Sequence, residues 1–240
     1  MYPFIHVFNK TIPTYGLMGV LGVLLGWLYV WIRCKRENRE LETDCVVLYM
    51  YGFIGALIGA KLFSLLQNLP AILNSFTLGL DGFIEFWSVN FRGGMVFYGG
   101  LMGALLFILL YARRYKIPLK IHMAILVPAL PLAHGFGRIG CYLAGCCYGH
   151  IADLPVQLVE ACCNFILCVL LTAFSRRAKD GHQVLAAYLV SYGILRFILE
   201  YFREDAVRGF LGPFSTSQII SFLALCAGIL IFVRSLLQKV

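Results

Sequence analysis

Long apolar runs separated by short polar segments dominate the chain. A helix that crosses a bilayer needs about 20 mostly apolar residues, and seven stretches of the chain reach that length. We therefore expect an all-α, polytopic membrane protein with seven transmembrane helices, folded as a single domain over residues 1–240. The seven stretches are 13–33, 45–67, 94–112, 121–143, 155–174, 183–202 and 216–236.

Composition supports a membrane environment. Hydrophobic residues make up 60% of the chain and charged residues only 13%, and the mean hydropathy is +0.82. A soluble domain carries about 25% charged residues, so the solvent of this chain is a bilayer. The first apolar stretch follows a segment with one lysine and no cleavage pattern, so we expect a retained span rather than a signal peptide.

Basic residues predict the orientation. Most of the 20 Lys and Arg residues follow the first, third, fifth and last apolar stretches, which places them on one side. These are Arg33, Lys35, Arg36, Arg39, Arg113, Arg114, Lys116, Lys120, Arg176, Arg177, Lys179, Arg234 and Lys239. The opposite side holds Lys10, Arg92, Arg203 and Arg208. The positive-inside rule then predicts an outer N-terminus and a cytoplasmic C-terminus. The net charge of +8 reflects this asymmetry, so nucleic acid is not an expected partner.

One long segment, residues 68–94, is too polar to span but rich in aromatic residues. Rings of this kind prefer the boundary between lipid and water, so we expect this segment to lie in the outer interface. Its aromatic residues are Phe76, Phe83, Phe86, Trp87 and Phe91.

Five charged residues remain inside the apolar stretches: Lys61, Arg138, Glu160, Arg196 and Glu200. A charge at membrane depth is costly, so each is a candidate for a functional site. The alternative is an ion pair that only holds two helices together. In the sixth stretch, Tyr192 is followed at four-residue steps by Arg196 and Glu200, which predicts one polar stripe on a helix.

The segment "HGFGRIGCYLAGCCYGH" (134–150) places Arg138 among glycines at the end of the fourth stretch. Glycines there break the helix and expose backbone N–H groups, and irregular backbone at membrane depth is tolerated where it lines a cavity. A guanidinium offers a planar fork that suits phosphate. We therefore expect a cradle for a phospholipid headgroup. In "FRGGMVFYGG" (91–100), Tyr98 is either an interface anchor or a functional group.

Seven fragments in order make the chain resemble the bacterial prolipoprotein diacylglyceryl transferases. They are "TYGLMG" (14–19), "GALIGAKL" (55–62), "GGMVFYGGLMG" (93–103), "GRIGCYLAGCCYG" (137–149), "LPVQLVEA" (154–161), "SYGILRFILEYFR" (191–203) and "STSQIIS" (215–221). The resemblance implies transfer of the diacylglyceryl group of phosphatidylglycerol to a cysteine thiol of a lipoprotein precursor, with release of glycerol phosphate. It also implies a multi-pass protein of the bacterial inner membrane.

The resemblance implies roles for particular residues. Arg138 and Arg196 would hold the phosphate and stabilise the charge that grows as the bond breaks. The other expected catalytic residues are Glu200, Tyr98, Cys146 and Cys141. Expected to line or shape the same cavity are Tyr15, Tyr192, Gly99, Gly100, Gly137, Gly149 and Cys147. The family usually has histidine where this chain has Tyr98, and asparagines and a glutamate where it has Cys141, Ala144 and Cys146.

Cys141, Cys146 and Cys147 leave several interpretations open. They fit a disulfide on an oxidising side, plain apolar packing, or a thiolate activated by Arg138. A metal site is less favoured, because the spacing C-x₄-C-C is not a usual zinc pattern. We therefore predict no metal and no cofactor. The other six of the nine cysteines lie in or next to the apolar stretches, and we expect them to serve only packing; they are Cys34, Cys45, Cys162, Cys163, Cys168 and Cys226.

Two functions of different classes follow. The first is the transferase, a monomer whose partners are phosphatidylglycerol and a lipoprotein precursor or another membrane acceptor. The second is a non-catalytic lipid-binding or redox-sensing membrane protein that keeps the phosphate cradle. Tyr192, Arg196 and Glu200 in register favour the first, and the missing histidine and asparagines favour the second.

Overall fold

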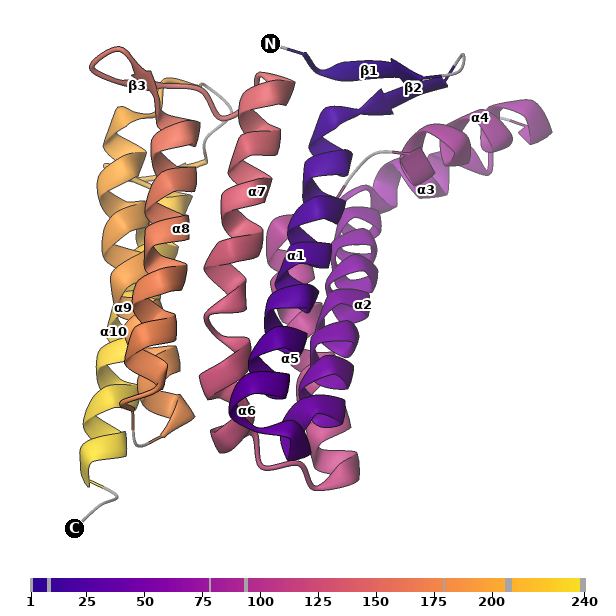
Figure 1. Ribbon diagram of the computed structural model, residues 1–240. Helices are drawn as coiled ribbons and strands as arrows, with labels where there is room; N and C mark the ends of the chain where they lie inside the picture. The colour runs from indigo at the N-terminus through magenta and orange to yellow at the C-terminus, as the bar shows by residue number, and fades with distance from the viewer. Residues whose placement is uncertain are drawn as a thin grey trace. The chain divides into compact units, whose positions relative to one another are not determined.

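The computed structural model describes residues 2–7, 10–77, 79–92, 95–178, 180–205 and 209–237. Within these residues, seven helical segments are long and apolar enough to cross a membrane, which confirms the predicted number of spans (Figure 1). Six of them are single long helices: α1 (Thr14–Glu37), α2 (Glu42–Gln67), α5 (Phe97–Tyr115), α8 (Val156–Ser175), α9 (Gly181–Leu199) and α10 (Thr216–Leu237). The remaining one is divided between α6 (Leu119–Leu126) and α7 (Ala129–Ala144).

Short elements connect the spans. Two helical turns, η1 (Arg39–Leu41) and η2 (Glu200–Phe202), follow α1 and α9. Three antiparallel hairpins pair β1 (Phe4–Val7) with β2 (Lys10–Pro13), β3 (His150–Ile151) with β4 (Leu154–Pro155), and β5 (Phe210–Leu211) with β6 (Phe214–Ser215). Each hairpin leads directly into a spanning helix, so the hairpins fix where α1, α8 and α10 begin.

The contacts divide the chain into two compact units. Unit 1 comprises Met1–Cys45 and Pro118–Val240, and unit 2 comprises Val46–Ile117. Each unit is described by itself below.

Unit 1 is a bundle in which α1 packs along α7, α7 packs on α8, and α9 packs on α10 and on α6. Glycine permits the close approach of α1 to α7: a Cβ added to Gly22 would lie 2.9 Å from the Cβ of Phe136. A buried apolar cluster joins α8 to α9 beside the end of α6, and it consists of Val127, Leu167, Leu171, Val184 and Tyr188. This cluster lies toward one end of the bundle, and it leaves the other end of α7, α8 and α9 to polar residues.

Unit 2 contains α2 from residue 46 onward and α5, which meet along small residues. A Cβ added to Gly103 would collide with the carbonyl oxygen of Gly55, so only glycine fits there. The unit also contains α3 (Leu69–Ser75) and α4 (Gly79–Arg92). These two short helices replace the single interface segment expected at 68–94, and their place at the membrane surface stays a prediction. Within that segment, residues 78, 93 and 94 and the side chain of Phe91 lie outside the described residues.

The fourth span breaks between α6 and α7 at Pro128, whereas the apolar pattern predicted one continuous helix over 121–143. Proline lacks an N–H and clashes with the carbonyl four residues before it, which here is the carbonyl of Ala124. That carbonyl instead accepts a hydrogen bond from Arg33 at 3.1 Å. Arg33 was expected in a loop, but it lies inside α1, is only 6% exposed and pairs with Glu37.

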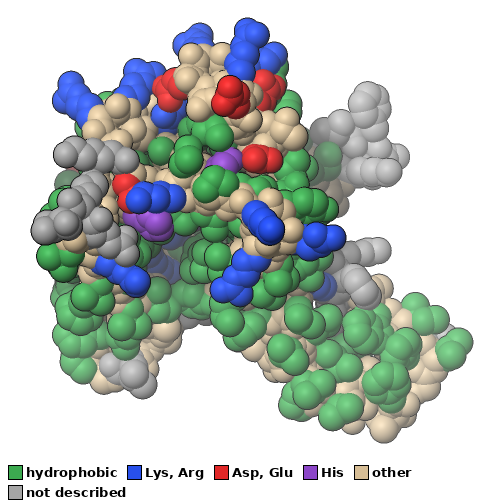
Figure 2. All heavy atoms as spheres, turned by 90° about the horizontal axis from the view of Figure 1, so that it is seen from below, with side chains coloured by type: hydrophobic (Ala, Val, Ile, Leu, Met, Phe, Trp, Pro, Cys, Tyr) green, Lys and Arg blue, Asp and Glu red, His purple; other side chains and the backbone are tan. Residues whose placement is uncertain are grey.

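Basic side chains gather at one end of unit 1, as the charge pattern predicts. Arg176 pairs with Glu37 at 2.9 Å and Lys120 with Asp180 at 3.2 Å, so the end of α1, the start of α6 and the α8–α9 connection meet there. Figure 2 looks at the molecule from below and shows Lys and Arg side chains on that face. Lys179, Arg208 and Lys239 lie outside the described residues, as do the side chains of Lys10 and Arg92.

Candidate active site

Charged side chains of alternating sign form a continuous, largely buried chain at the other end of unit 1. Arg138 of α7 pairs with Glu160 of α8 at 2.9 Å, and Glu160 also contacts Arg196 of α9 at 3.4 Å. Arg196 pairs with Glu200 at 2.8 Å, and Glu200 with Arg203 at 3.1 Å. A buried charge is tolerated where a partner of opposite sign compensates it. We call Arg138, Glu160, Arg196, Glu200 and Arg203 the arginine–carboxylate cluster.

Two members of the cluster have further polar partners. Arg203 forms a second ion pair with Asp205 at 2.6 Å, and Arg196 donates a hydrogen bond to the Ser217 hydroxyl of α10 at 3.3 Å. Glu160, Arg196 and Glu200 are exposed by 2%, 8% and 2%. The ion pairs of Glu160 therefore join α7, α8 and α9, although Arg138, Glu160 and Arg196 lie far apart in the sequence.

One face of α8 supplies polar groups beside Glu160. Gln157, Glu160 and Asn164 are spaced by three and four residues, which puts them on one helix face, and all three are buried. The amide of Gln157 donates to the carbonyl of Cys146 at 3.1 Å, and that of Asn164 to the carbonyl of Glu160 at 2.8 Å. The side-chain oxygens of Gln157 and Asn164, however, are buried and accept no hydrogen bond from any residue that the structure describes.

An aromatic group also contacts Arg138. Tyr192 makes a side-chain contact with Arg138, and its ring stacks on Tyr188 with centroids 5.6 Å apart. His134 lies 5.2 Å from the Tyr192 ring and 3.3 Å from the Tyr188 hydroxyl. The predicted stripe of Tyr192, Arg196 and Glu200 is thus real: its three side chains all reach the cluster.

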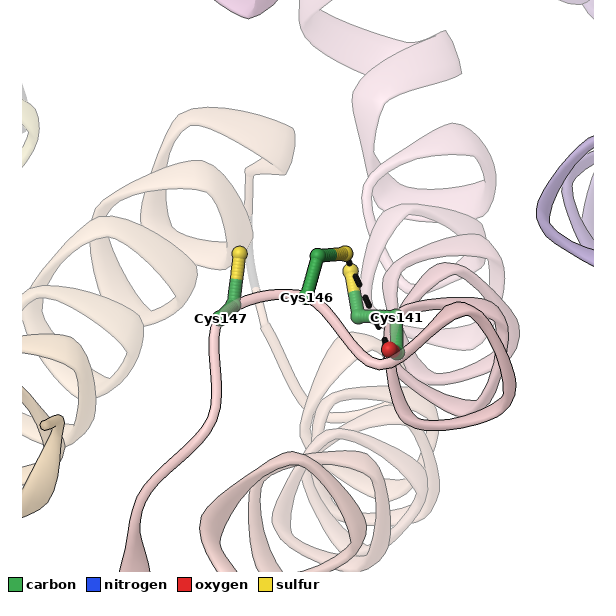
Figure 3. A group of neighbouring side chains, drawn as sticks. All are labelled: Cys141, Cys146 and Cys147. Atoms are coloured by element: carbon green, nitrogen blue, oxygen red, sulfur yellow. Dashed lines mark hydrogen bonds between the residues drawn. The ribbon is translucent and has the colours of Figure 1, made fainter. Parts of the chain in front are cut away.

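Cys141, Cys146 and Cys147 come together where α7 ends. Gly145 adopts a left-handed conformation with φ of +74°, which stops the helix, and Cys147 has a φ of +56°. The Cys146 N–H and thiol both point at the carbonyl oxygen of Cys141, the N–H at 3.1 Å (Figure 3). The three sulfur atoms all lie within 4.8 Å of one another.

The surroundings of these cysteines favour a thiolate at one of them. A hydrogen bond from the Cys141 thiol lowers the pKa of Cys147 to about 5, against the opposing effect of burial. The positive charges of Arg203 and Arg138 also lower the pKa of Cys147. Burial, by contrast, raises the pKa of Cys146. A thiolate beside arginines was one of the interpretations left open by the sequence, and Cys147, rather than Cys146, is the cysteine it fits. The structure records all three as free thiols.

Tyr15 and two of the predicted glycines lie close to this cysteine loop. Tyr15, near the start of α1, has Cys141, Cys146 and Arg138 within electrostatic reach. A Cβ added to Gly149 would collide with the carbonyl oxygen of Phe202, because the loop pairs there with the segment after α9. A Cβ on Gly137 would meet nothing within 4 Å, so the space beside Arg138 is open there.

We expect Gly149→Ala to lower the melting temperature by several degrees, because the added methyl group meets backbone rather than a movable side chain. The measurement is thermal unfolding of the purified protein in detergent. Gly137→Ala is the matched control and should leave the melting temperature unchanged or higher, since alanine favours a helix over glycine by about 1 kcal/mol. Equal melting temperatures for the two variants would contradict the close contact at Gly149.

Three predicted site residues belong to unit 2. Tyr98, Gly99 and Gly100 lie in the first turn of α5. Gly99 packs against α2, since an added Cβ would collide with the Cβ of Phe63. Helix packing therefore accounts for this glycine within its own unit. The roles of all three residues in the site stay predictions.

Sequence reasoning missed several members of the site. Glu160 was flagged as an intramembrane charge but not as a site residue, and Arg203 was assigned to the outer loops. Gln157, Asn164 and Asp205 were not considered. The spacing of Gln157, Glu160 and Asn164 in "VQLVEACCN" (156–164) was the available signal, because it puts three polar groups on one face of an apolar helix.

The fold and the site together define a polytopic α-helical membrane protein with a buried arginine–carboxylate cluster. The family model described as prolipoprotein diacylglyceryl transferase matches residues 3–234. The chain therefore belongs to the prolipoprotein diacylglyceryl transferase family, as its sequence motifs indicated.

Individual relatives agree. The chain is 30% identical to the phosphatidylglycerol–prolipoprotein diacylglyceryl transferase of Clostridium tetani, over 95% of this chain and 94% of the relative. It is 34% identical to that of Geobacter sulfurreducens, over 87% of this chain and 85% of the relative. It is 32% identical to that of Photobacterium profundum, over 86% of this chain and 82% of the relative.

Proposed function

We propose that this chain transfers the diacylglyceryl group of phosphatidylglycerol to a cysteine thiol of a prolipoprotein and releases glycerol phosphate. The observation that carries the proposal is the pair of guanidinium groups, the half-buried Arg138 and the buried Arg196, held on either side of the buried Glu160. The relatives named above carry this activity in their names. The site has to bind a phosphodiester and stabilise the charge on the departing phosphate.

The arginines suit that task because they are held in place before the lipid arrives. Arg138 contacts Glu160 through Nε, and a guanidinium has five N–H donors, so donors remain for phosphate oxygens beyond those contacts in the described residues. Fixed donors at the position where charge develops lower the barrier without reorganisation during the reaction. The buried amides of Gln157 and Asn164 lie on the same face of α8 as Glu160 and can bind the hydroxyls of the glycerol headgroup.

An apolar groove between α9 and α10 suits the acyl chains. It has a volume of about 310 Å³ and is lined by Phe197, Phe214, Ile219 and Phe222, with Gln218. Phe197 directly follows Arg196 in α9, and Ser217, which contacts Arg196, belongs to the same helix as Phe222. A phospholipid with its phosphate at Arg196 would therefore lay an acyl chain between α9 and α10.

The remaining roles belong to this proposal as well. Glu200 orients Arg196 and Arg203 by pairing with both, and Tyr192 and Tyr15 lie within reach of Arg138. Tyr98 would take the place of the histidine that the family usually has. We also propose an outer N-terminus, a cytoplasmic C-terminus, a place in the bacterial cytoplasmic membrane, and a monomer. The basic end of unit 1 supports this orientation, since basic residues favour the cytoplasmic side.

The test is incubation of purified protein with phosphatidylglycerol and a lipobox peptide, followed by mass spectrometry. We expect a peptide heavier by one diacylglyceryl group when its acceptor residue is cysteine, and no change when it is serine. In sealed membrane vesicles, peptide added outside should react in right-side-out vesicles but not in inverted ones. Lipid that is retained without any adduct would instead support a protein that binds lipid and does not catalyse.

A further inference from the structure

The sulfur atoms of Cys141, Cys146 and Cys147 have the spacing that one metal ion requires. A Zn²⁺ ion binds thiolates at about 2.3 Å, so sulfurs of one tetrahedral site lie about 3.8 Å apart. In this chain, each of the three sulfurs is within 4.8 Å of the other two. Small rotations of the three side chains would bring the sulfurs to that separation. The linear spacing C-x₄-C-C is not a usual zinc pattern, but the chain folds back on itself after α7 and brings the three sulfurs together.

Backbone geometry holds the three side chains on one side of the loop. Cys141 lies in the last turn of α7, and Gly145 with its left-handed φ reverses the chain immediately before Cys146. Cys147 adopts a φ of +56°, which costs a residue other than glycine about 1 kcal/mol or more. Strain of that kind persists where the surroundings enforce it and often marks a functional position. Figure 3 shows the sulfurs of Cys141 and Cys146 next to one another, with Cys147 beside them.

Neighbouring elements support the loop from two sides. Gln157 of α8 donates a hydrogen bond to the carbonyl of Cys146 at 3.1 Å, and the Tyr148 carbonyl accepts the N–H of Glu204 at 3.0 Å. Two positive charges, Arg138 and Arg203, are within electrostatic reach of Cys147. They would offset part of the negative charge of three thiolates around a divalent cation, which carries only two positive charges.

We propose that Cys141, Cys146 and Cys147 bind one thiophilic divalent cation of the Zn²⁺ type, whose open fourth position takes the thiol of the acceptor cysteine. The second half of this proposal rests on the proposed function. Catalytic zinc sites have three protein ligands and keep one position open for substrate. Cys146 is exposed, so an acceptor can reach the cation from outside the loop.

The cation would give the reaction the nucleophile it needs. A thiol that coordinates such a cation loses its proton, here to water, and becomes a thiolate beside Arg138. That sulfur then forms a bond to the terminal glyceryl carbon of the lipid. The bond from this carbon to the phosphate oxygen breaks, and its electron pair leaves with glycerol phosphate. No electron is gained or lost overall, so the step needs no oxidant or reductant.

The first experiment measures binding of Cd²⁺, used as the probe, to the full-length protein in detergent after reduction and removal of the reductant. Cadmium thiolates absorb in the ultraviolet, which reports each sulfur bound. We expect one high-affinity Cd²⁺ per chain, and at least tenfold weaker binding in Cys147→Ser and in Cys141→Ser. Cys162→Ser is the matched control, because Cys162 is exposed on α8 and should not affect binding. Unchanged melting temperatures would show that the variants fold.

The second experiment adds a lipobox peptide to the Cd²⁺-loaded protein. A peptide with the acceptor cysteine should increase the thiolate absorption by about a third, as a fourth sulfur joins three, whereas the serine peptide should not. Absence of Cd²⁺ binding, or full binding by Cys147→Ser, would overturn the site. Binding without any increase from the cysteine peptide would overturn its role toward the acceptor.

Failure of this proposal is distinct from failure of the proposed function. Diacylglyceryl transfer that proceeds in protein unable to bind Cd²⁺ would leave the transferase intact and remove the metal site. Cd²⁺ binding with a fourth thiolate, but with no diacylglyceryl adduct under any condition, would leave the site and remove the transferase.

Discussion

Replacement of Arg138 by lysine will lower the rate of diacylglyceryl transfer about 10²- to 10³-fold, the usual cost of losing one preorganised donor to a developing oxyanion. Lysine keeps the positive charge but loses the planar fork that holds Glu160 and phosphate at the same time. The rate is measured with saturating phosphatidylglycerol and a lipobox peptide. Arg138→Ala should be slower still, because it also leaves Glu160 without one of its two partners.

The control for this experiment is Arg177→Lys. Arg177 is exposed and lies at the basic end of unit 1, away from the arginine–carboxylate cluster. Its replacement should leave the rate unchanged, so a loss seen only at Arg138 reports the cluster. An Arg138→Lys variant as active as the parent would contradict the role given to the guanidinium. A variant that binds lipid less tightly but reacts at the same maximal rate would assign Arg138 to lipid binding alone.

The spans could be predicted from the sequence because apolar length alone specifies a helix that crosses a membrane. The stripe of Tyr192, Arg196 and Glu200 could be predicted too, since their four-residue spacing fixes one face of α9 and of the turn η2 that follows it. The chemistry of proline could have predicted the break at Pro128, but the predicted span over 121–143 ran through it. Arg33 was missed for a different reason: its burial depends on the carbonyl of Ala124, a partner about 90 residues away in the chain.

The centre of the site could not be derived from local patterns. Glu160 matters because it contacts arginines on two other helices, and no spacing within α8 reveals which helices face it. The same holds for Arg203, whose partners Glu200 and Asp205 are local but whose loop is fixed by pairing with Gly149. For the three cysteines, the local pattern pointed away from the observed arrangement. Their linear spacing is not a usual metal-binding pattern, whereas the turn at Gly145 brings their sulfurs together.

The cluster also constrains how a phosphate enters. Glu160 already occupies both Arg138 and Arg196, and the members Arg138, Arg196 and Arg203 are balanced by Glu160, Glu200 and Asp205. An anionic headgroup therefore has to share the arginines with a carboxylate or displace it. In the proposed function, this competition would keep the arginines stable in the absence of lipid, and it would make the strength of lipid binding depend on Glu160.

Replacement of Glu160 by glutamine is expected to lower the free energy of unfolding by about 3 kcal/mol in an uncharged detergent. The reason is that the replacement removes one charge from a network of buried ion pairs. For a chain of this size, that corresponds to a fall in melting temperature of about 6–12 °C. The measurement is thermal unfolding followed by tryptophan fluorescence. Glu40→Gln is the control: Glu40 is exposed, so its replacement should leave the melting temperature unchanged.

Addition of phosphatidylglycerol should restore much of the stability lost by Glu160→Gln, and should stabilise the variant more than the parent protein. The phosphate then takes the place of the missing carboxylate, and a ligand that binds only the folded state raises the melting temperature. A zwitterionic phospholipid, whose phosphate is paired with its own cation, should restore less. An equal response of parent and variant to phosphatidylglycerol would refute the competition between Glu160 and the donor phosphate, since nothing would then be gained by removing the carboxylate.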